Sequence, residues 1–145
     1  MRDVFNIAIC LMDAQHEGTG ATDTADTKEY RLRTPPLLNS ILDRAYPASD
    51  GYPGSAGGHR PVCPKVTAME DEIDLDGRIC TGVLPYGLAA LLLTEENPTL
   101  SNFFWQTFLE QLEEARQSVP GDEGSVEDTY GVLSDTLEFG RFGRW

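Results

Sequence analysis

The first regular hydrophobic pattern in the chain covers residues 3–16. Apolar side chains recur there three or four positions apart, which predicts an amphipathic helix. Residues 18–27 are small and polar and predict a loop, whose end offers Asp26 or Thr27 as an N-cap for the next helix. The predicted stripe consists of Val4, Ile7, Ala8 and Leu11, widened by Phe5, Ile9 and Met12.

A second helical pattern follows this loop and is interrupted by Pro35 and Pro36. The two prolines remove two backbone donors and bias Thr34 away from helical angles. We therefore expect either a sharp kink at this point or two helices, roughly 28–33 and 35–45. The side chains expected to face the core are Tyr30, Leu37, Leu38, Ile41, Leu42 and Ala45.

Residues 47–64 hold four prolines and four glycines among eighteen residues, a density that excludes regular elements. A loop of this length inside a compact domain is commonly functional or disordered. In residues 65–77, weak alternation at Val66, Ile73 and Leu75 is compatible with a short strand pair or an extended ribbon.

The strongest pattern is a pair of helices in the second half of the chain. In residues 84–97, Pro85 suits a first turn, and the apolar run that follows it covers every face, so this helix should lie at the centre of the domain. Asn97 and Pro98 predict the cap and first turn of a last helix, over about 98–118, packed antiparallel on its predecessor. Its expected stripe is Leu100, Phe103 or Phe104, Phe108, Leu112 and Ala115, with Glu110, Glu113, Glu114 and Arg116 facing water.

The pattern changes after Gly121, beyond which no helical or strand period is sustained. The sequence therefore predicts a mainly α fold, a small bundle of about four helices with a long Gly/Pro loop and at most a short β-ribbon. We expect a helical domain over residues 1–120 and an extended C-terminal arm over residues 121–145.

The chain has 24 acidic and 11 basic residues, which give a formal net charge of −13. This charge disfavours sequence-specific binding of DNA, because it repels the phosphate backbone. It either confers solubility alone or forms an acidic surface along which DNA slides without sticking, and composition does not choose between the two. At the N-terminus, Asp3, Asn6 and Asp13 interrupt the apolar stretch, so we expect a soluble intracellular protein without a signal peptide or a membrane span.

Candidate chemistry is sparse. The three cysteines, at 10, 63 and 80, have no CxxC spacing, and His16 lies far from His59, so unpaired thiols are favoured over a zinc site. Residues 70–77 begin like a calcium loop, but Val83 stands where its bidentate glutamate should fall, which favours a solvated acidic turn before a helix. No serine lies in a GxSxG context and no glycine cluster forms a phosphate cradle, so we expect no enzyme, metal or cofactor.

The end of the arm has a different character. Phe139, Phe142 and Trp145 alternate with glycine and with Arg141 and Arg144. Such aromatics are costly to leave in water and are typical of a peptide that fills pockets on a partner, where its arginines pair with carboxylates. The alternative is that the segment folds back onto its own domain. We favour a partner, because a polar stretch separates these residues from the predicted helices. The residues expected to bind it are Leu137, Phe139, Arg141, Phe142, Arg144 and Trp145.

Taken together, three stretches resemble bacteriophage head–tail adaptor (connector) proteins. The first is the helix Val4–Asp13 with its small-residue loop and TKEYRLRTPPLLNSILDRAYP. The second is AMEDEIDLDGRICTGVLPYGLAALLLTEENPTLSNFFWQTFLEQLEEA, and the third is VEDTYGVLSDTLEFGRFGRW. They span most of the chain in the right order, although none is a catalytic signature. Pro35-Pro36 and the length of the 47–64 loop depart from the pattern.

The resemblance implies a structural protein of the virion neck, assembled in the bacterial cytoplasm as a homo-oligomeric ring, commonly of about twelve copies. Its partners would be the portal protein, tail or stopper proteins and copies of itself, with DNA passing through the channel without sequence-specific binding. The arm would reach the portal or a neighbouring adaptor. The loop and the acidic turn would face the tail components or the channel, and the residues expected there are Tyr52, His59, Arg60, Asp71 and Glu72.

Two rival interpretations remain. Within the same class, the alternative is a tail-side stopper or completion protein, which should bind an assembled adaptor and not bare portal. From another class, it could be a regulatory module that stays out of virions and captures one protein with its C-terminal peptide.

Overall fold

A computed structural model describes residues 1–14, 16–54 and 58–118. They form four helices of nine or more residues, one shorter α-helix and a single 3-10 turn, and no strand is assigned among them. The mainly α fold and the bundle of about four helices are confirmed, whereas the arm of residues 121–145 lies outside the described residues. The elements are α1 (Arg2–Leu11), α2 (Lys28–Ala45), η1 (Tyr46–Ala48), α3 (Gly77–Gly82), α4 (Leu84–Leu92) and α5 (Pro98–Gln117).

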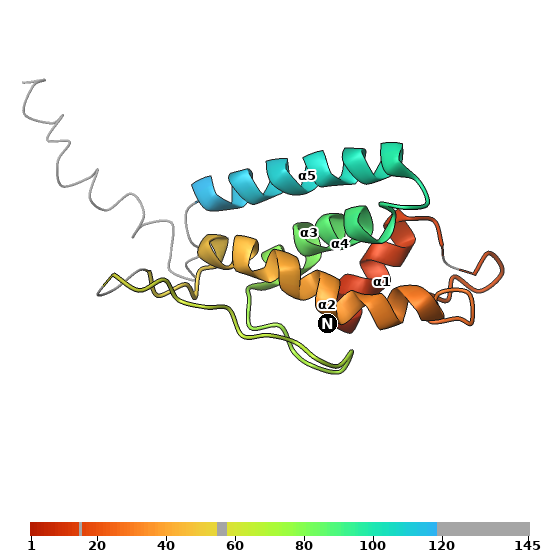
Figure 1. The fold of residues 1–145 in the computed structure, drawn as a ribbon, viewed down its shortest axis with the longest axis horizontal. Coiled ribbons are helices and arrows are strands. Elements are labelled where there is room, and N and C mark those ends of the chain that lie inside the picture. Colours follow the sequence, from red (N-terminus) through yellow and green to blue (C-terminus); the bar gives the residue numbers. More distant parts are fainter. Residues whose placement is uncertain (15, 55–57, 119–145) are drawn as a thin grey trace, which may run out of the picture.

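Helix α4 lies in the middle of the bundle, with α5 along one side and α2 along the other (Figure 1). Its apolar sequence is buried on nearly every face, as predicted, and Pro85 occupies its first turn. Gly87 lets α5 and α2 approach closely, because a Cβ atom there would stand 2.9 Å from Phe108 and 2.9 Å from Ile41. The residues of α4 buried in the core are Leu84, Pro85, Gly87, Leu88, Ala89, Ala90 and Leu92.

Helix α5 begins as the sequence predicts, because the Asn97 side chain accepts a hydrogen bond from the Leu100 N–H at 3.1 Å. The choice that the pattern left open is resolved in favour of Phe104, which is 5% exposed, whereas Phe103 is 62% exposed. The buried stripe is Ser101, Phe104, Phe108, Leu112 and Ala115.

Helix α2 runs without a break through Pro35 and Pro36, so of the two expected outcomes, a kink or two separate helices, the second is wrong. Tertiary contacts hold both halves in one helix. In the first half, Tyr30 donates a hydrogen bond to Glu96, beyond α4, at 2.5 Å. In the second half, Leu38 and other apolar residues are fully buried. Thr34, just before the prolines, is also buried and donates its hydroxyl to the Tyr30 carbonyl at 2.8 Å. Packing of this kind outweighs the local cost of proline.

Helix α1 is shorter than predicted and ends at Leu11 instead of residue 16. Asp13 adopts a left-handed φ of 54°, and the Ala14 N–H bonds to the Ile9 carbonyl at 3.1 Å, which closes the helix in a Schellman-type cap. Thr27 occupies the N-cap position of α2 but does not cap it. Its hydroxyl instead donates to the Thr22 carbonyl at 2.6 Å and so folds the preceding loop.

Residues 58–76, which we call the strap, run beside α2 to the start of α1, turn at residues 68–71 and return to the start of α3 (Figure 1). The short strand pair that the sequence allowed here is not formed, since no strand is assigned in the described part of the chain. The backbone of Val66 pairs instead with a side chain of α2. The Asn39 amide donates to the Val66 carbonyl at 2.7 Å, and its oxygen accepts from the Val66 N–H at 2.9 Å. Two side chains of the strap itself, Cys63 and Val66, are buried in the hydrophobic core. The start of the predicted 47–64 loop is also more regular than expected, since η1 includes Pro47 and Ala48.

Candidate functional site

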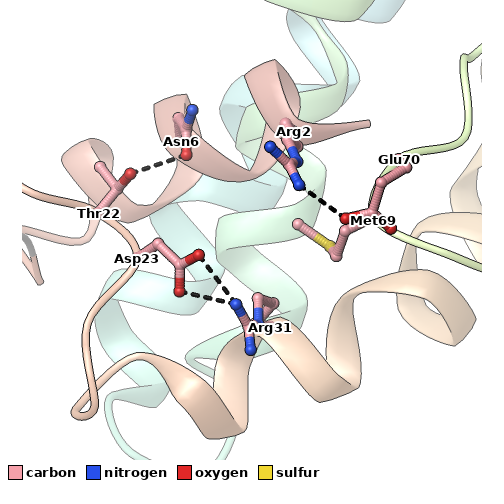
Figure 2. Close-up of a pocket in the computed structure, with 7 residues that line it drawn as sticks. All are labelled: Arg2, Asn6, Thr22, Asp23, Arg31, Met69 and Glu70. Carbon is pink, nitrogen blue, oxygen red and sulfur yellow. Dashed lines mark hydrogen bonds and ion pairs between the residues drawn. The ribbon is translucent and has the colours of Figure 1, made fainter.

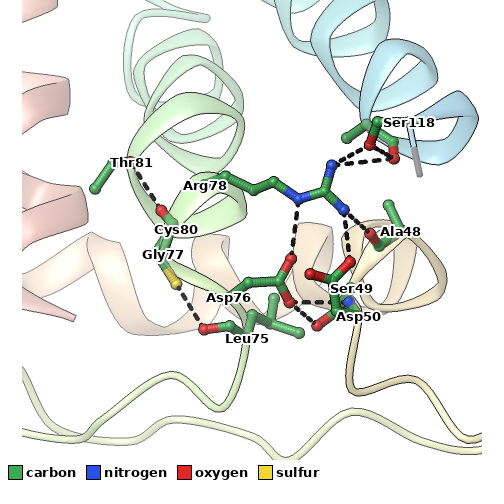
Figure 3. Close-up of polar contacts among 11 residues, drawn as sticks. Ala48, Ser49, Asp50, Leu75, Asp76, Gly77, Arg78, Cys80, Thr81 and Ser118 are labelled. Atoms are coloured by element: carbon green, nitrogen blue, oxygen red, sulfur yellow. Dashed lines mark hydrogen bonds and ion pairs between the residues drawn. The ribbon is translucent and has the colours of Figure 1, made fainter. Parts of the chain in front are cut away.

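One arginine ties together the end of the bundle from which the C-terminal segment continues. Arg78, at the start of α3, donates to Ser118 and, at 3.5 Å, to the Ala115 carbonyl, both at the end of α5 (Figure 3). The same guanidinium donates at 3.2 Å to the Ala48 carbonyl and at 2.9 Å to Asp50. We call this set of contacts the Arg78 junction. It fixes the end of α5 to the beginning of the Gly/Pro loop.

Asp76 completes the junction. Its carboxylate accepts from the Ser49 hydroxyl, from the Asp50 N–H at 3.0 Å and from Arg78 Nε at 3.3 Å. Partial burial acts to raise the pKa of Asp76, but these hydrogen bonds favour the charged form and hold the pKa below the ordinary value of 3.8. The residue that resembled a calcium ligand in the sequence is therefore engaged within the protein.

The five loop residues expected to face a partner fall into two separate groups. Tyr52, His59 and Arg60 lie beside the C-terminal end of α2, where Tyr52 packs edge-on against Tyr46 with ring centroids 5.1 Å apart. Arg60 donates to the Asp43 carbonyl at 3.3 Å, and His59 is exposed. Asp71 and Glu72 instead lie beside the start of α1, at the far end of the strap.

Asp71 stabilises a turn. Its carboxylate accepts from the Ala68 N–H at 2.9 Å and from the Thr67 N–H at 2.7 Å. These backbone donors and the Thr67 hydroxyl lower the pKa of Asp71. Glu72 is exposed beside it. Of this pair, Glu72 offers the more accessible carboxylate to a partner.

The six arm residues expected to bind a partner lie outside the described residues, so their role stays a prediction. They are Leu137, Phe139, Arg141, Phe142, Arg144 and Trp145.

A polar cavity of about 450 Å³ lies between α1, α2 and the strap (Figure 2). Arg2 pairs with Glu70 at 2.8 Å, and Arg31 pairs with Asp23 at 2.9 Å. The bond to Glu70 raises the pKa of Arg2, and the same bond lowers the pKa of Glu70. Each arginine is thus paired with a carboxylate, and the two ion pairs that line the cavity connect separate parts of the fold.

The described residues contain no group of three or more side chains that could hold a metal ion. Cys63 is buried, Cys80 is half-buried and Cys10 is exposed, and none of the three forms a disulfide. Burial raises the pKa values of Cys63 and Cys80, which disfavours the reactive thiolate. No helix in the described part of the chain is long and apolar enough to cross a membrane.

A second hollow, of about 190 Å³, lies between α3 and α5, and we call it the α3–α5 groove. Gly82 forms part of its wall and leaves it open, because a Cβ atom there would meet nothing within 4 Å. The groove reaches Ser118, the last described residue of the chain. Its lining residues are Arg78, Gly82, Val83, Gln111, Glu114, Ala115 and Ser118.

The sequence patterns did not predict the roles of Arg78 and Asn39, whose side chains hydrogen-bond to segments distant in the sequence. Their partners lie up to 40 positions away for Arg78 and 27 for Asn39, so no local pattern marks either residue. Comparison of the chain with models of protein families, with curated proteins and with solved structures finds no match.

Proposed function

We propose that this protein is a head–tail adaptor of a bacteriophage, a structural component that forms a ring between the capsid portal and the tail. The observation that carries the proposal is the Arg78 junction, which ties the end of α5 to η1 at 3.5 Å and 3.2 Å. The two segments that the resemblance assigns to neighbouring proteins, the Gly/Pro loop and the C-terminal arm, therefore start from one fixed end of the bundle.

This geometry suits a subunit that must hold several neighbours at once. An arm that starts from a fixed point loses less conformational freedom when its end binds than an arm that starts from a mobile one. The loop beside it carries exposed His59 and Arg60, while the arm carries aromatic side chains at positions 139, 142 and 145. A portal or neighbouring subunit could bind the arm while a tail component contacts the loop.

The net charge is compatible with the same function. Each copy contributes a formal −13, so a ring of about twelve copies would carry a large negative charge, some of it facing the DNA in the channel. Such a surface keeps DNA mobile, because it offers the phosphates no favourable contacts. A channel protein needs this property, and acidic residues on the channel side would supply it.

The first test is mass spectrometry of purified phage particles from a lysate in which the gene is expressed. The adaptor proposal predicts the chain in intact particles, at a constant ratio to the portal protein. Its absence from particles would refute the proposal and favour a regulatory module that uses its C-terminal peptide.

A pull-down with purified portal protein separates an adaptor from a stopper. The full chain should bind bare portal, whereas a stopper should bind only a portal that already carries its adaptor. Removal of residues 137–145 should abolish binding while the far-UV helical signal stays unchanged, because the described core is built from earlier residues. A matched variant that keeps the arm's length and replaces only Glu123 and Glu127 with glutamine should still bind.

A further inference from the structure

The α3–α5 groove is a hollow of about 190 Å³ between two helices of the bundle. Its floor is formed by Val83 and Ala115, which are 3% and 9% exposed, and its wall is left open by Gly82. Gln111 and Glu114 form the opposite rim. The groove thus combines an apolar floor with the Glu114 carboxylate at its edge, while Arg78, which also lines it, is already paired with Asp50 and Asp76. A carboxylate beside an apolar floor suits a peptide that carries both apolar and cationic side chains.

The same side of α5 continues the groove along the helix. Phe103, Thr107, Glu110 and Glu114 follow one another at spacings of four, three and four residues, which places them on one helical face. Phe103 is 62% exposed, although its ring touches buried Phe104 at a centroid distance of 5.7 Å. An exposed aromatic at one end and two carboxylates nearer the groove therefore form a single surface.

The C-terminal segment of this chain matches that surface in charge and in place. Arg141 and Arg144 complement Glu110 and Glu114, and aromatic side chains alternate with these arginines. The chain leaves the described structure at Ser118, which itself lines the groove. The eighteen residues from 119 to 136 can span up to about 60 Å, whereas Phe103 lies only about 22 Å along α5 from Ser118.

We propose that the α3–α5 groove and the adjoining face of α5 bind residues 137–145 of the same chain before any partner is present. A linker of this length gives the segment an effective concentration on the order of millimolar, far above that of a second copy in dilute solution. Docking would cover aromatic side chains that are costly to expose. A partner with a better pocket then takes the segment from the groove.

This inference stands without the adaptor proposal, since it concerns the free protein alone. Nuclear magnetic resonance of the full chain tests it through the backbone amides of Gln111 and Glu114. Replacing Phe139, Phe142 and Trp145 with alanine should shift these amides, and Gly82→Leu, which fills the groove, should shift the amides of residues 139–145. Adding Gly82→Leu to the alanine variant should not shift the amides of residues 139–145 any further than in the alanine variant alone, because the segment is already released there.

Gly51→Leu is the matched control, because a Cβ atom at Gly51 would likewise meet nothing within 4 Å and Gly51 lies outside the groove. It should leave residues 139–145 unchanged. Since Gly82→Leu could disturb folding, a second variant reverses the rim charges, Glu110→Lys with Glu114→Lys, and should likewise release the segment. All shifts should be independent of protein concentration.

Two results would overturn the proposal. If the alanine replacements leave Gln111 and Glu114 unshifted, the segment does not occupy the groove. If the chemical-shift differences between the wild-type chain and the alanine variant disappear on dilution, the occupant is the segment of a second copy, and docking within one chain is wrong.

Discussion

Gly87 in α4 lies so close to Phe108 in α5 that a Cβ atom at position 87 would stand 2.9 Å from Cδ2 of the Phe108 ring. The same atom would stand 2.9 Å from Cδ1 of Ile41 in α2. This glycine therefore sets how closely the central helix approaches both neighbours. A side chain at this position would push the helices apart or displace two fully buried side chains.

Gly87→Ala should therefore destabilise the protein. Overpacking costs about 1–3 kcal/mol, and the better helix propensity of alanine offsets at most about 1 kcal/mol. We expect a net loss of about 1 kcal/mol in the free energy of unfolding, measured by urea titration. Gly82→Ala is the control, because its added methyl group meets open space and should leave stability unchanged or slightly higher. Equal effects at the two positions would contradict the close packing around Gly87.

Arg78→Lys should weaken the Arg78 junction although the charge is kept. An ammonium group cannot reproduce the fork with which the guanidinium reaches η1, Asp76 and the end of α5 together. The side chain is 37% exposed, so we expect a loss of about 1–2 kcal/mol instead of the larger cost of a buried ion pair. Amide hydrogen exchange should also accelerate at residues 115–118.

Arg2→Lys provides the comparison for that prediction. Arg2 also pairs with a carboxylate, Glu70, but both side chains are about two-thirds exposed. Its replacement should leave the free energy of unfolding close to that of the wild type, because water screens this pair, and should leave exchange at residues 115–118 unchanged. If the two lysine variants behave alike, the junction contributes no more than an ordinary surface ion pair.

Local sequence patterns correctly predicted the central helix α4 and the start of α5. The continuous apolar run after Pro85 identified the central helix, and the Asn97-Pro98 pair located the start of α5. Both signals act within one or two helical turns. The exposed position of Phe103 could not be predicted, because Phe103 and Phe104 are adjacent and both are compatible with the stripe until a neighbouring helix selects one.

The remaining features depend on contacts between distant residues. Pro35 and Pro36 locally favour a break, and only the packing of both halves of α2 on other elements keeps the helix continuous. The candidate site has the same character. The resemblance to adaptor proteins implies one partner-facing surface for the Gly/Pro loop and for Asp71 and Glu72, whereas the strap carries these two carboxylates to the start of α1.

Asp76 should make the stability of the protein depend on pH in the acid range. Its folded-state pKa lies below the ordinary value of 3.8, so its charged form is the one that the fold favours. The stabilising contribution is complete above the unfolded-state pKa and is lost as the pH falls through the lower, folded-state value. Urea unfolding between about pH 7 and about pH 3 should show this loss.

Asp76→Asn tests the assignment. The variant should be less stable than the wild type near neutral pH, and the difference should shrink as the pH falls, because the wild-type carboxylate becomes protonated. Asp74→Asn, at an exposed carboxylate two residues earlier, is the control and should run parallel to the wild type. A difference between Asp76→Asn and the wild type that stays constant with pH would assign the effect to shape and not to charge.

Asn39→Ala should release the strap from α2. The replacement leaves the Val66 N–H and carbonyl, both partly buried, without the partners that bind them at 2.9 Å and 2.7 Å. Unpaired buried groups of this kind cost about 1–3 kcal/mol each at most, so we expect a loss of about 2 kcal/mol in the free energy of unfolding. Trypsin should cleave faster after Lys65, whose ammonium group also bonds to the Asn39 carbonyl at 3.4 Å.

Two further variants serve as controls for Asn39→Ala. Asn39→Asp, which can still accept from the Val66 N–H, should have a stability between those of the wild type and Asn39→Ala. Asn102→Ala, on the exposed side of α5, should change neither measurement. If Asn39→Ala matches that control, the buried side chains of Cys63 and Val66 hold the strap without help from the amide.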